Sequence, residues 1–279
     1  MLEIHEILDR FELLYPASLK ISDLRRSYID RDLLSIFRLV NDDNKEDFRK
    51  LIMEHNIWKL WTLLETYSST NFTSAFKTFY INDIKFNKDC FSRGQLYSKI
   101  WLVKELSKLD VDLGTVFLCA GWYATLATML FESNIKVNKI RSFDIDPDVV
   151  KIAEIFNKPW VMDDWKFKPA TEDIMDINYN THSYKVKRAD STVCELIDSP
   201  NTIINTSCEH IVDFEIWYNK IPANKLVVLQ SNNYFDIAEH VNCVKSLEEF
   251  KNQTPMTTEL YEGELDLGKY KRFMRIGYK

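Results

Sequence analysis

The sequence predicts an α/β fold with a mostly parallel sheet of seven strands, an antiparallel C-terminal hairpin and a mainly α-helical region before the sheet. Residues 1 to about 105 show helical periodicity, whereas from Gly114 onward short apolar runs alternate with helical patterns. Alternating strands and helices imply βαβ units and parallel strands. We therefore predict a helical domain over residues 1–105 and an α/β domain over residues 106–279.

The helical region is clearest at its start. In "LEIHEILDRFELL" the residues that fall on one helical face are Ile4, Ile7, Leu8, Phe11 and Leu14. Residues 71–95, "NFTSAFKTFYINDIKFNKDCFSRGQ", are less regular and are interpreted as a loop or short strands. The next run, "LYSKIWLVKELSKL", is predicted to be a helix leading into the first strand.

The α/β region contains five apolar strand candidates: "TVFLCA", "KIRSFD", "WKFKPAT", "TIINTS" and "KLVVLQS". Helical patterns at "DPDVVKIAEIFN" and "DFEIWYNKI" separate some of them. The last two strand-like runs, "TTELYEGELDLG" and "KYKRFMRIGYK", meet at Gly268-Lys269, which indicates a hairpin.

Composition excludes several classes of protein. The net charge of -6 argues against a dedicated nucleic-acid binder, although "KVKR" is one short basic candidate. The five cysteines form no CxxC pair, which is typical of reduced thiols and predicts a cytoplasmic protein. No apolar run approaches the ~20 residues of a membrane span, so no membrane association is expected.

The first strand candidate ends in a possible cofactor loop. Gly121 follows Ala120, and its missing Cβ would let a ligand approach the backbone at the start of the next helix. A lone glycine after a strand is more often an ordinary structural turn than a cofactor site. Asp144 ends the second strand, 23 residues after Gly121, where a carboxylate can accept hydrogen bonds from ribose hydroxyls. Asp146 and Pro147 make a helix start, so we expect Asp144 to be left free for a ligand.

Three motifs carry a family resemblance. "FLCAGWYATLATML", "SFDIDPDVVKIAE" and "TEDIMDI" resemble the first three motifs of class I S-adenosylmethionine-dependent methyltransferases, over about residues 113–279. The resemblance implies a Rossmann-like fold, S-adenosyl-L-methionine as cofactor, and a ribose contact from the acid of the second motif. The cofactor-binding residues that it implies are Ala120, Gly121, Trp122, Tyr123, Asp144, Ile145, Asp173 and Ile174, with the last two at the adenine. Residues 1–105 match no family.

The first motif departs from the family's pattern, which usually has two or three glycines. A nicotinamide dinucleotide needs a close approach of its pyrophosphate to a helix, and hence the fuller GxGxxG pattern. S-adenosylmethionine has no phosphate, so the missing glycines favour the methyl donor over NAD. We expect Trp122 to fill space or to pack on the ligand.

The segment after the fourth strand, "NTSCEHIVDFEIWY", lies where an acceptor should meet the cofactor. In one interpretation Glu209 or His210 is a general base and Asn205, near the cofactor, orients the acceptor. Cys208 lies roughly where five-methylcytosine enzymes place a nucleophilic cysteine, although their usual proline is missing.

Two other interpretations of this segment remain open. Cys208, Glu209 and His210 could bind a metal, but contiguous ligands seldom all point inward and no partner cluster is visible, so no metal is expected. Alternatively, Thr206 or Ser207 caps a helix. A separate polar cluster precedes the first strand, where Arg93 can pair with the methionine carboxylate of the cofactor.

The predicted function is methyl transfer from S-adenosylmethionine to an N or O nucleophile, on a small molecule or a protein. The helical domain would be a lid or a substrate-selecting wall. The alternatives are a nucleic-acid (tRNA or DNA) methyltransferase, an NAD-dependent oxidoreductase and a non-catalytic S-adenosylmethionine-binding module. The sequence does not predict an oligomeric state.

Overall fold

The computed structural model describes residues 71–188 and 190–279. The chain divides into two compact units, Met1–Ile84 and Lys85–Lys279, which are described separately. The helices predicted within residues 1–70 lie outside the described residues. None of the described helices is long and apolar enough to cross a bilayer.

In the first unit the described element is helix α6, Asn71–Ile81. The prediction of a loop or short strands over residues 71–95 is therefore wrong here, and residues Lys88–Phe91 likewise form a 3-10 helix, η1, in the second unit. Aromatic and β-branched residues favour strands by propensity. Ala75 and Phe79 are one helical turn apart and both buried, so packing of one helical face outweighs that propensity.

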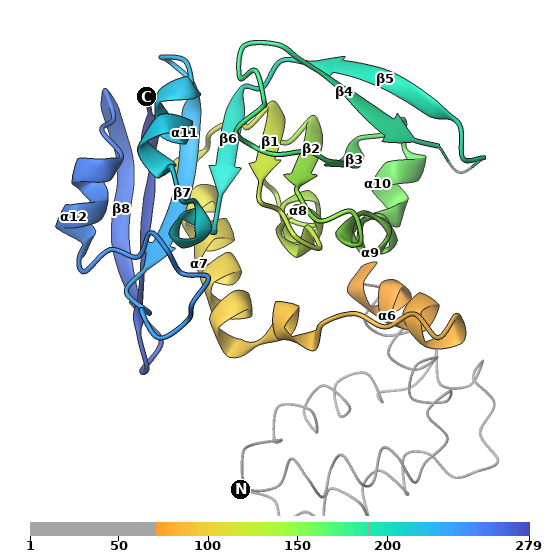
Figure 1. The fold of residues 1–279 in the computed structure, drawn as a ribbon, viewed down its shortest axis with the longest axis horizontal. Helices are drawn as coiled ribbons and strands as arrows, with labels where there is room; N and C mark the ends of the chain where they lie inside the picture. Colours follow the sequence, from red (N-terminus) through yellow and green to blue (C-terminus); the bar gives the residue numbers. More distant parts are fainter. Residues whose placement is uncertain (1–70, 189) are drawn as a thin grey trace, which may run out of the picture. The chain divides into compact units, whose positions relative to one another are not determined.

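The second unit contains a seven-stranded sheet in the order β3-β2-β1-β6-β7-β9-β8 (Figure 1). Its strands are β1 Thr115–Cys119, β2 Lys139–Asp144, β3 Phe167–Thr171, β6 Thr202–Asn205, β7 Leu226–Asn232, β8 Thr258–Asp266 and β9 Lys271–Tyr278. The first five are parallel, and β9 pairs antiparallel with both β7 and β8. The predicted sheet and its C-terminal hairpin are confirmed.

Helices cover both faces of the sheet. They are α7 Arg93–Leu109, α8 Thr125–Phe131, α9 Val149–Phe156, α10 Lys158–Met162, η2 Cys208–His210, α11 Phe214–Lys220 and α12 Leu247–Gln253. Side chains of α7 and α8 pack on one face, and those of α11 and α12 on the other. Leu102 and Leu106 of α7 are almost fully buried in this core, so α7 belongs to the larger unit although the predicted boundary lies near residue 105. The role of the preceding region as a lid stays a prediction.

One hairpin has no counterpart in the sequence prediction. Strands β4 His182–Lys187 and β5 Val193–Asp198 form a separate two-stranded antiparallel sheet. Alternate residues of β4 are buried, and Tyr184 and Val186 join the core on the α11 face. The buried Arg141 of β2 holds Asp198 at 2.7 Å, which ties the hairpin to the main sheet.

Candidate functional site

The carboxyl ends of the central strands lie level with one another. Cys119, the last residue of β1, is opposite Phe143 of β2 and Asn205, the last residue of β6. Strands β1 and β6 are neighbours in the sheet but distant in the chain, so the strand order reverses between them. Such a switch point is where open α/β sheets bind ligands. The ends of β1, β2 and β6 and the segments after them, which carry most of the predicted site residues, therefore lie at one edge.

The loop between β1 and α8 has an unusual backbone. Ala120, Trp122 and Ala124 have φ values of 50°, 49° and 49°, in the left-handed region. A residue with a Cβ pays about 1–2 kcal/mol there, which is why glycine is the usual occupant. Three alternating positions thus adopt glycine-like conformations without glycine, and the loop is strained at each.

The packing of the loop gives a second reason for the glycine at position 121. Gly121 does not have a positive φ. A Cβ at this position would lie 2.1 Å from Ser142 Oγ on β2. The side chain of Leu118 is also 3.2 Å from that point. Gly121 therefore lets the loop pack closely against β2, and its contact with a ligand stays a prediction.

Asp144 binds the same loop. Its Oδ2 accepts a hydrogen bond from the Trp122 N–H at 2.7 Å, and its Oδ1 accepts one from the Asp146 N–H at 3.1 Å. The expectation that Asp144 is left free is thus wrong, although a carboxylate oxygen can accept more than one hydrogen bond. Burial raises the pKa of the Asp144 carboxyl, because it penalises the charged form.

The helix start after β2 also differs from the prediction. Helix α9 begins at Val149, and Asp148 rather than Asp146 is its N-cap residue. Asp146 instead accepts the Asp148 N–H at 2.9 Å and closes the preceding turn. Ile145, which directly follows Asp144, is 70% exposed, so an apolar side chain at this edge lacks cover.

The aromatic pair in the loop packs on the chain that precedes α7. Trp122 and Tyr123 stack with ring centroids 4.7 Å apart. The Tyr123 hydroxyl accepts the Asn87 N–H at 3.2 Å, and its ring meets Phe86 edge-to-face. This contact links the loop after β1 to the segment at the start of the second unit.

The other predicted cofactor residues lie less favourably. Asp173 is exposed and accepts the Met175 N–H at 2.8 Å, but the side chain of Ile174 is buried in the core on the α11 face. Arg93, the first residue of α7, is exposed with its guanidinium 5.5 Å from the centre of the Tyr97 ring. The roles of Asp173, Ile174 and Arg93 stay predictions.

Asn205 ends β6 and is fully buried. Its Oδ1 accepts the Ser207 N–H at 2.8 Å. Its Nδ2 has no hydrogen-bond partner among the residues that the structure describes. A buried donor without a partner is costly, and such groups in native proteins call for an explanation such as a ligand.

The structure places Cys208 in the core and Ser207 at the start of η2. The Cys208 thiol is fully buried, and burial raises its pKa well above the ordinary value, which disfavours the thiolate that a nucleophile needs. Ser207 occupies the N-cap position of η2 but makes no side-chain capping bond. Instead, Asn205 satisfies the Ser207 N–H from outside the helix.

Glu209 and His210 differ in environment. Glu209 is 2% exposed, and its Oε1 accepts hydrogen bonds from Asn232 Nδ2 at 2.6 Å and from Arg272 at 3.1 Å. His210 is exposed and meets the ring of His240 edge-to-face, with centroids 4.7 Å apart. Sequence reasoning missed His240. It comes from the loop after β7, and the signal was its position beyond the carboxyl end of a parallel strand.

Sequence reasoning also missed the state of Lys99. This lysine of α7 is 6% exposed, and its ammonium donates to Gln95 Oε1 at 2.6 Å. Burial, together with the positive charge of Arg272, lowers the pKa of Lys99 to about 7. The helix therefore carries a buried amine that can lose its proton near neutral pH.

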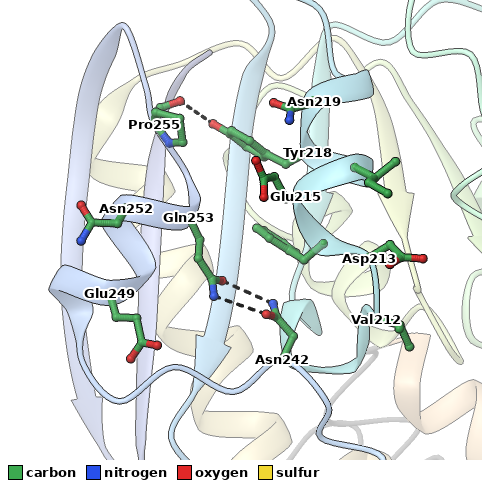
Figure 2. Close-up of a pocket in the computed structure, with 12 residues that line it drawn as sticks. Val212, Asp213, Glu215, Tyr218, Asn219, Asn242, Glu249, Asn252, Gln253 and Pro255 are labelled. Carbon is green, nitrogen blue, oxygen red and sulfur yellow. Dashed lines mark hydrogen bonds between the residues drawn. The ribbon is translucent and has the colours of Figure 1, made fainter.

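A hollow of about 720 Å³ lies elsewhere, between α11 and α12 (Figure 2). Asn242 and Gln253 bind each other across it at 3.4 and 3.3 Å, and Tyr218 donates to the Pro255 carbonyl at 2.7 Å. It contains none of the predicted site residues and lies over one face of the sheet. The edge at the switch point is the better candidate site, because Asp144, the loop after β1 and the Asn205 amide lie there.

Comparisons with known proteins bear on the fold. No protein-family model matches the sequence, and no curated protein does either. The structure is similar to that of the N-methyltransferase NodS from Bradyrhizobium japonicum WM9 in complex with S-adenosyl-L-homocysteine, with a TM-score of 0.51 and 8% identity over 74% of this chain and 98% of that chain. The magnesium protoporphyrin IX methyltransferase ChlM from Synechocystis PCC 6803 with bound SAM aligns at a TM-score of 0.42 and 11% identity, over 66% of this chain and 76% of that chain. The chain therefore has the fold of the class I S-adenosylmethionine-dependent methyltransferases.

Proposed function

We propose that this protein binds S-adenosylmethionine at the carboxyl edge of its sheet and transfers the methyl group to an N or O nucleophile of a small molecule or protein. The fold, and the SAH-bound state of the NodS structure, support the cofactor. The net charge of -6 supports an acceptor other than a nucleic acid.

One observation carries the proposal: the strained loop after β1 is bonded to the acid that ends β2. The Trp122 N–H binds Asp144 at 2.7 Å, and the Gly121 N–H binds the Phe143 carbonyl at 3.1 Å. Strained backbone persists where the surroundings over-determine it, and it clusters at ligand sites. Three residues of this loop adopt backbone conformations that usually favour glycine, although Gly121 is the single glycine of the loop.

The groups at this edge suit the parts of the cofactor. Asp144 has acceptor capacity left for ribose hydroxyls. Ile145 offers an uncovered apolar surface for the adenine, as its 70% exposure indicates. The unpaired amide N–H of Asn205 would gain a partner from a ligand beside the switch point.

The chemistry asks for little beyond alignment. S-adenosylmethionine supplies a methyl group that its sulfonium already activates. The chain has to hold the acceptor in line with that methyl group and free the acceptor's lone pair. Among the predicted residues at and after the end of β6, we take Asn205, Glu209 and His210 as the candidates for this task.

Calorimetry of the full chain with S-adenosylmethionine, S-adenosylhomocysteine and NAD tests the proposal. We expect the first two to bind, and Asp144→Ala to weaken them at least ~10-fold, because hydrogen bonds to a charged group are worth about 1.5–3 kcal/mol each. Asp144→Asn keeps an acceptor for the Trp122 N–H and guards against misfolding. The control is Asp148→Ala, an exposed residue of the same segment with no side-chain capping bond. Binding of NAD alone, or equal affinities for the Asp144 and Asp148 variants, would overturn the proposal.

A further inference from the structure

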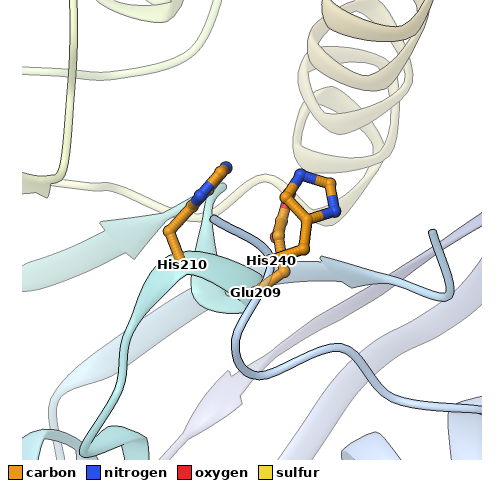
Figure 3. Close-up of side chains that lie close together, drawn as sticks. All are labelled: Glu209, His210 and His240. Carbon is orange, nitrogen blue, oxygen red and sulfur yellow. The ribbon is translucent and has the colours of Figure 1, made fainter. Parts of the chain in front are cut away.

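Two histidines and a glutamate from separate loops meet beside the candidate site. Glu209 and His210 belong to η2, directly after β6, and His240 lies in the loop after β7 (Figure 3). One ligand atom from each of the three side chains lies within 4.8 Å of the others. The objection from sequence, that contiguous residues rarely share a ligand, is answered by His240, which supplies the missing partner from a second loop.

The two oxygens of the Glu209 carboxylate differ in their hydrogen bonding. Asn232 and Arg272 both hold its Oε1, so the side chain is fixed in place. Its Oε2 is buried and has no hydrogen-bond partner among the described residues. An unpaired buried carboxylate oxygen is costly, and a bound cation would relieve that cost. Metal-binding carboxylates are commonly held by such outer hydrogen bonds.

Both imidazole rings are set for coordination through one nitrogen. His210 Nδ1 is 3.0 Å from the Glu239 carbonyl oxygen, and His240 Nδ1 is 2.6 Å from the Tyr234 carbonyl oxygen. A carbonyl can only accept, so each Nδ1 carries the proton and donates it. Each Nε2 is therefore left with a lone pair. Metal-binding histidines typically have this arrangement, in which a backbone carbonyl fixes the tautomer.

We propose that Glu209, His210 and His240 bind a divalent transition-metal ion, with Zn²⁺ as the ion that fits this donor set best. Two imidazoles and one carboxylate are a known set for zinc sites that keep an open position. Magnesium and calcium prefer all-oxygen ligands, so they fit less well. Because His210 is exposed, the open positions face outward, where water or another ligand can bind.

The position of the ion gives it a role that rests on the proposed methyl transfer. Glu209 is four residues beyond Asn205, at the end of β6 where the acceptor should meet the cofactor. A metal lowers the pKa of a bound hydroxyl or water. The acceptor's proton would pass to bulk water, its oxygen lone pair would form the new bond to the methyl carbon, and the C–S bond pair would return to sulfur, which leaves neutral S-adenosylhomocysteine.

Metal binding can be measured without any methyl transfer. The untagged full chain, freed of metal with a chelator, is titrated with Zn²⁺ by calorimetry and with Co²⁺ by visible absorption. We expect one ion per chain. Loss of an outer partner alone typically weakens metal affinity 10–100-fold, so His210→Ala and His240→Ala should each weaken it ~100-fold or more. Glu209→Gln should have a similar effect, and Asp236→Asn, an exposed carboxylate in the His240 loop, should have none.

The outcomes separate the two proposals. No stoichiometric binding of Zn²⁺ or Co²⁺, or wild-type affinity in both histidine variants, would overturn the metal site. Thermal melting of each variant shows whether it folds, and His210→Ala, which changes an exposed side chain, keeps the test valid if the Glu209 variant does not. S-adenosylhomocysteine binding is measured on the metal-free chain, and metal binding is measured without the cofactor. Failure of the proposed function therefore does not affect the test of the metal site, and failure of the metal site does not affect the test of the proposed function.

Discussion

Replacing Ala120 by glycine should stabilise this protein, against the usual effect of adding a glycine. Ala120 has a φ of 50°, and a residue with a Cβ pays about 1–2 kcal/mol in that region. Glycine gives back about 0.5–1 kcal/mol through the entropy of the unfolded chain. The net expectation is a gain of about 0.5–1 kcal/mol in the free energy of unfolding, or a melting temperature about 1–4 °C higher for a domain of this size. The Ala120 side chain is only half-buried, so little apolar contact is lost.

A matched substitution a few residues later should have the opposite sign. Ala127 lies in α8 with helical geometry and is fully buried. Ala127→Gly loses about 1 kcal/mol of helix propensity and up to ~0.8 kcal/mol of methyl burial. Urea denaturation with unchanged m-values measures both variants on one scale. If Ala120→Gly destabilises the protein as Ala127→Gly does, the loop is not strained at Ala120 and the reasoning from its backbone fails.

Two other predictions concern buried groups near the site. Gly121→Ala should destabilise by ~1–3 kcal/mol through its clash with Ser142 Oγ, and Ser142→Ala should restore much of that loss; a double variant no more stable than Gly121→Ala would contradict the clash. Lys99→Met should be more stable than wild type at pH 7, because the native pKa of Lys99 is about 7 against 10.5 unfolded. Between those values the unfolded state holds one more proton than the folded state, so the stability of the wild type rises with pH. The stability difference between Lys99→Met and wild type therefore narrows by about 1.4 kcal/mol per pH unit. If the stabilities of wild type and Lys99→Met change in parallel over pH 7–9.5, this prediction is wrong. The control is Lys104→Met, an exposed change on the same helix, whose stability should run parallel to that of wild type.

The sheet could be predicted from sequence because its strands carry their signal locally. The run Val116–Cys119 is buried on both faces, which makes it a continuous apolar segment bounded by turns. The β4–β5 hairpin was missed although β4 alternates buried and exposed residues, because its buried positions are only His182, Tyr184 and Val186. Helix α6 was missed because its aromatic and β-branched content favours a strand until tertiary packing is known.

The site was predictable in position but less so in detail. Strand ends place Asp144 and Asn205 at one edge from sequence alone. The contacts that decide their chemistry come from distant chain: the partner of His210 is His240, and the charge that holds Glu209 is Arg272 of the last strand. Burial, too, is a tertiary property, and the sequence does not show that the Cys208 thiol lies in the core.

Hydrogen bonds to β2 explain how the loop after β1 adopts left-handed conformations with a single glycine. A glycine-rich loop reaches left-handed conformations through its own residue preferences, whereas here bonds to β2 impose them. The carboxylate of Asp144 makes one of those bonds, so the group proposed to hold the ribose also shapes the loop that would meet the rest of the cofactor. Cofactor affinity and loop conformation should therefore be coupled through Asp144. Asp144→Ala removes both contributions, while Asp144→Asn keeps the acceptor for Trp122 and removes the charge. We therefore expect Asp144→Ala to bind S-adenosylhomocysteine more weakly than Asp144→Asn, and equal affinities of the two variants would contradict the coupling.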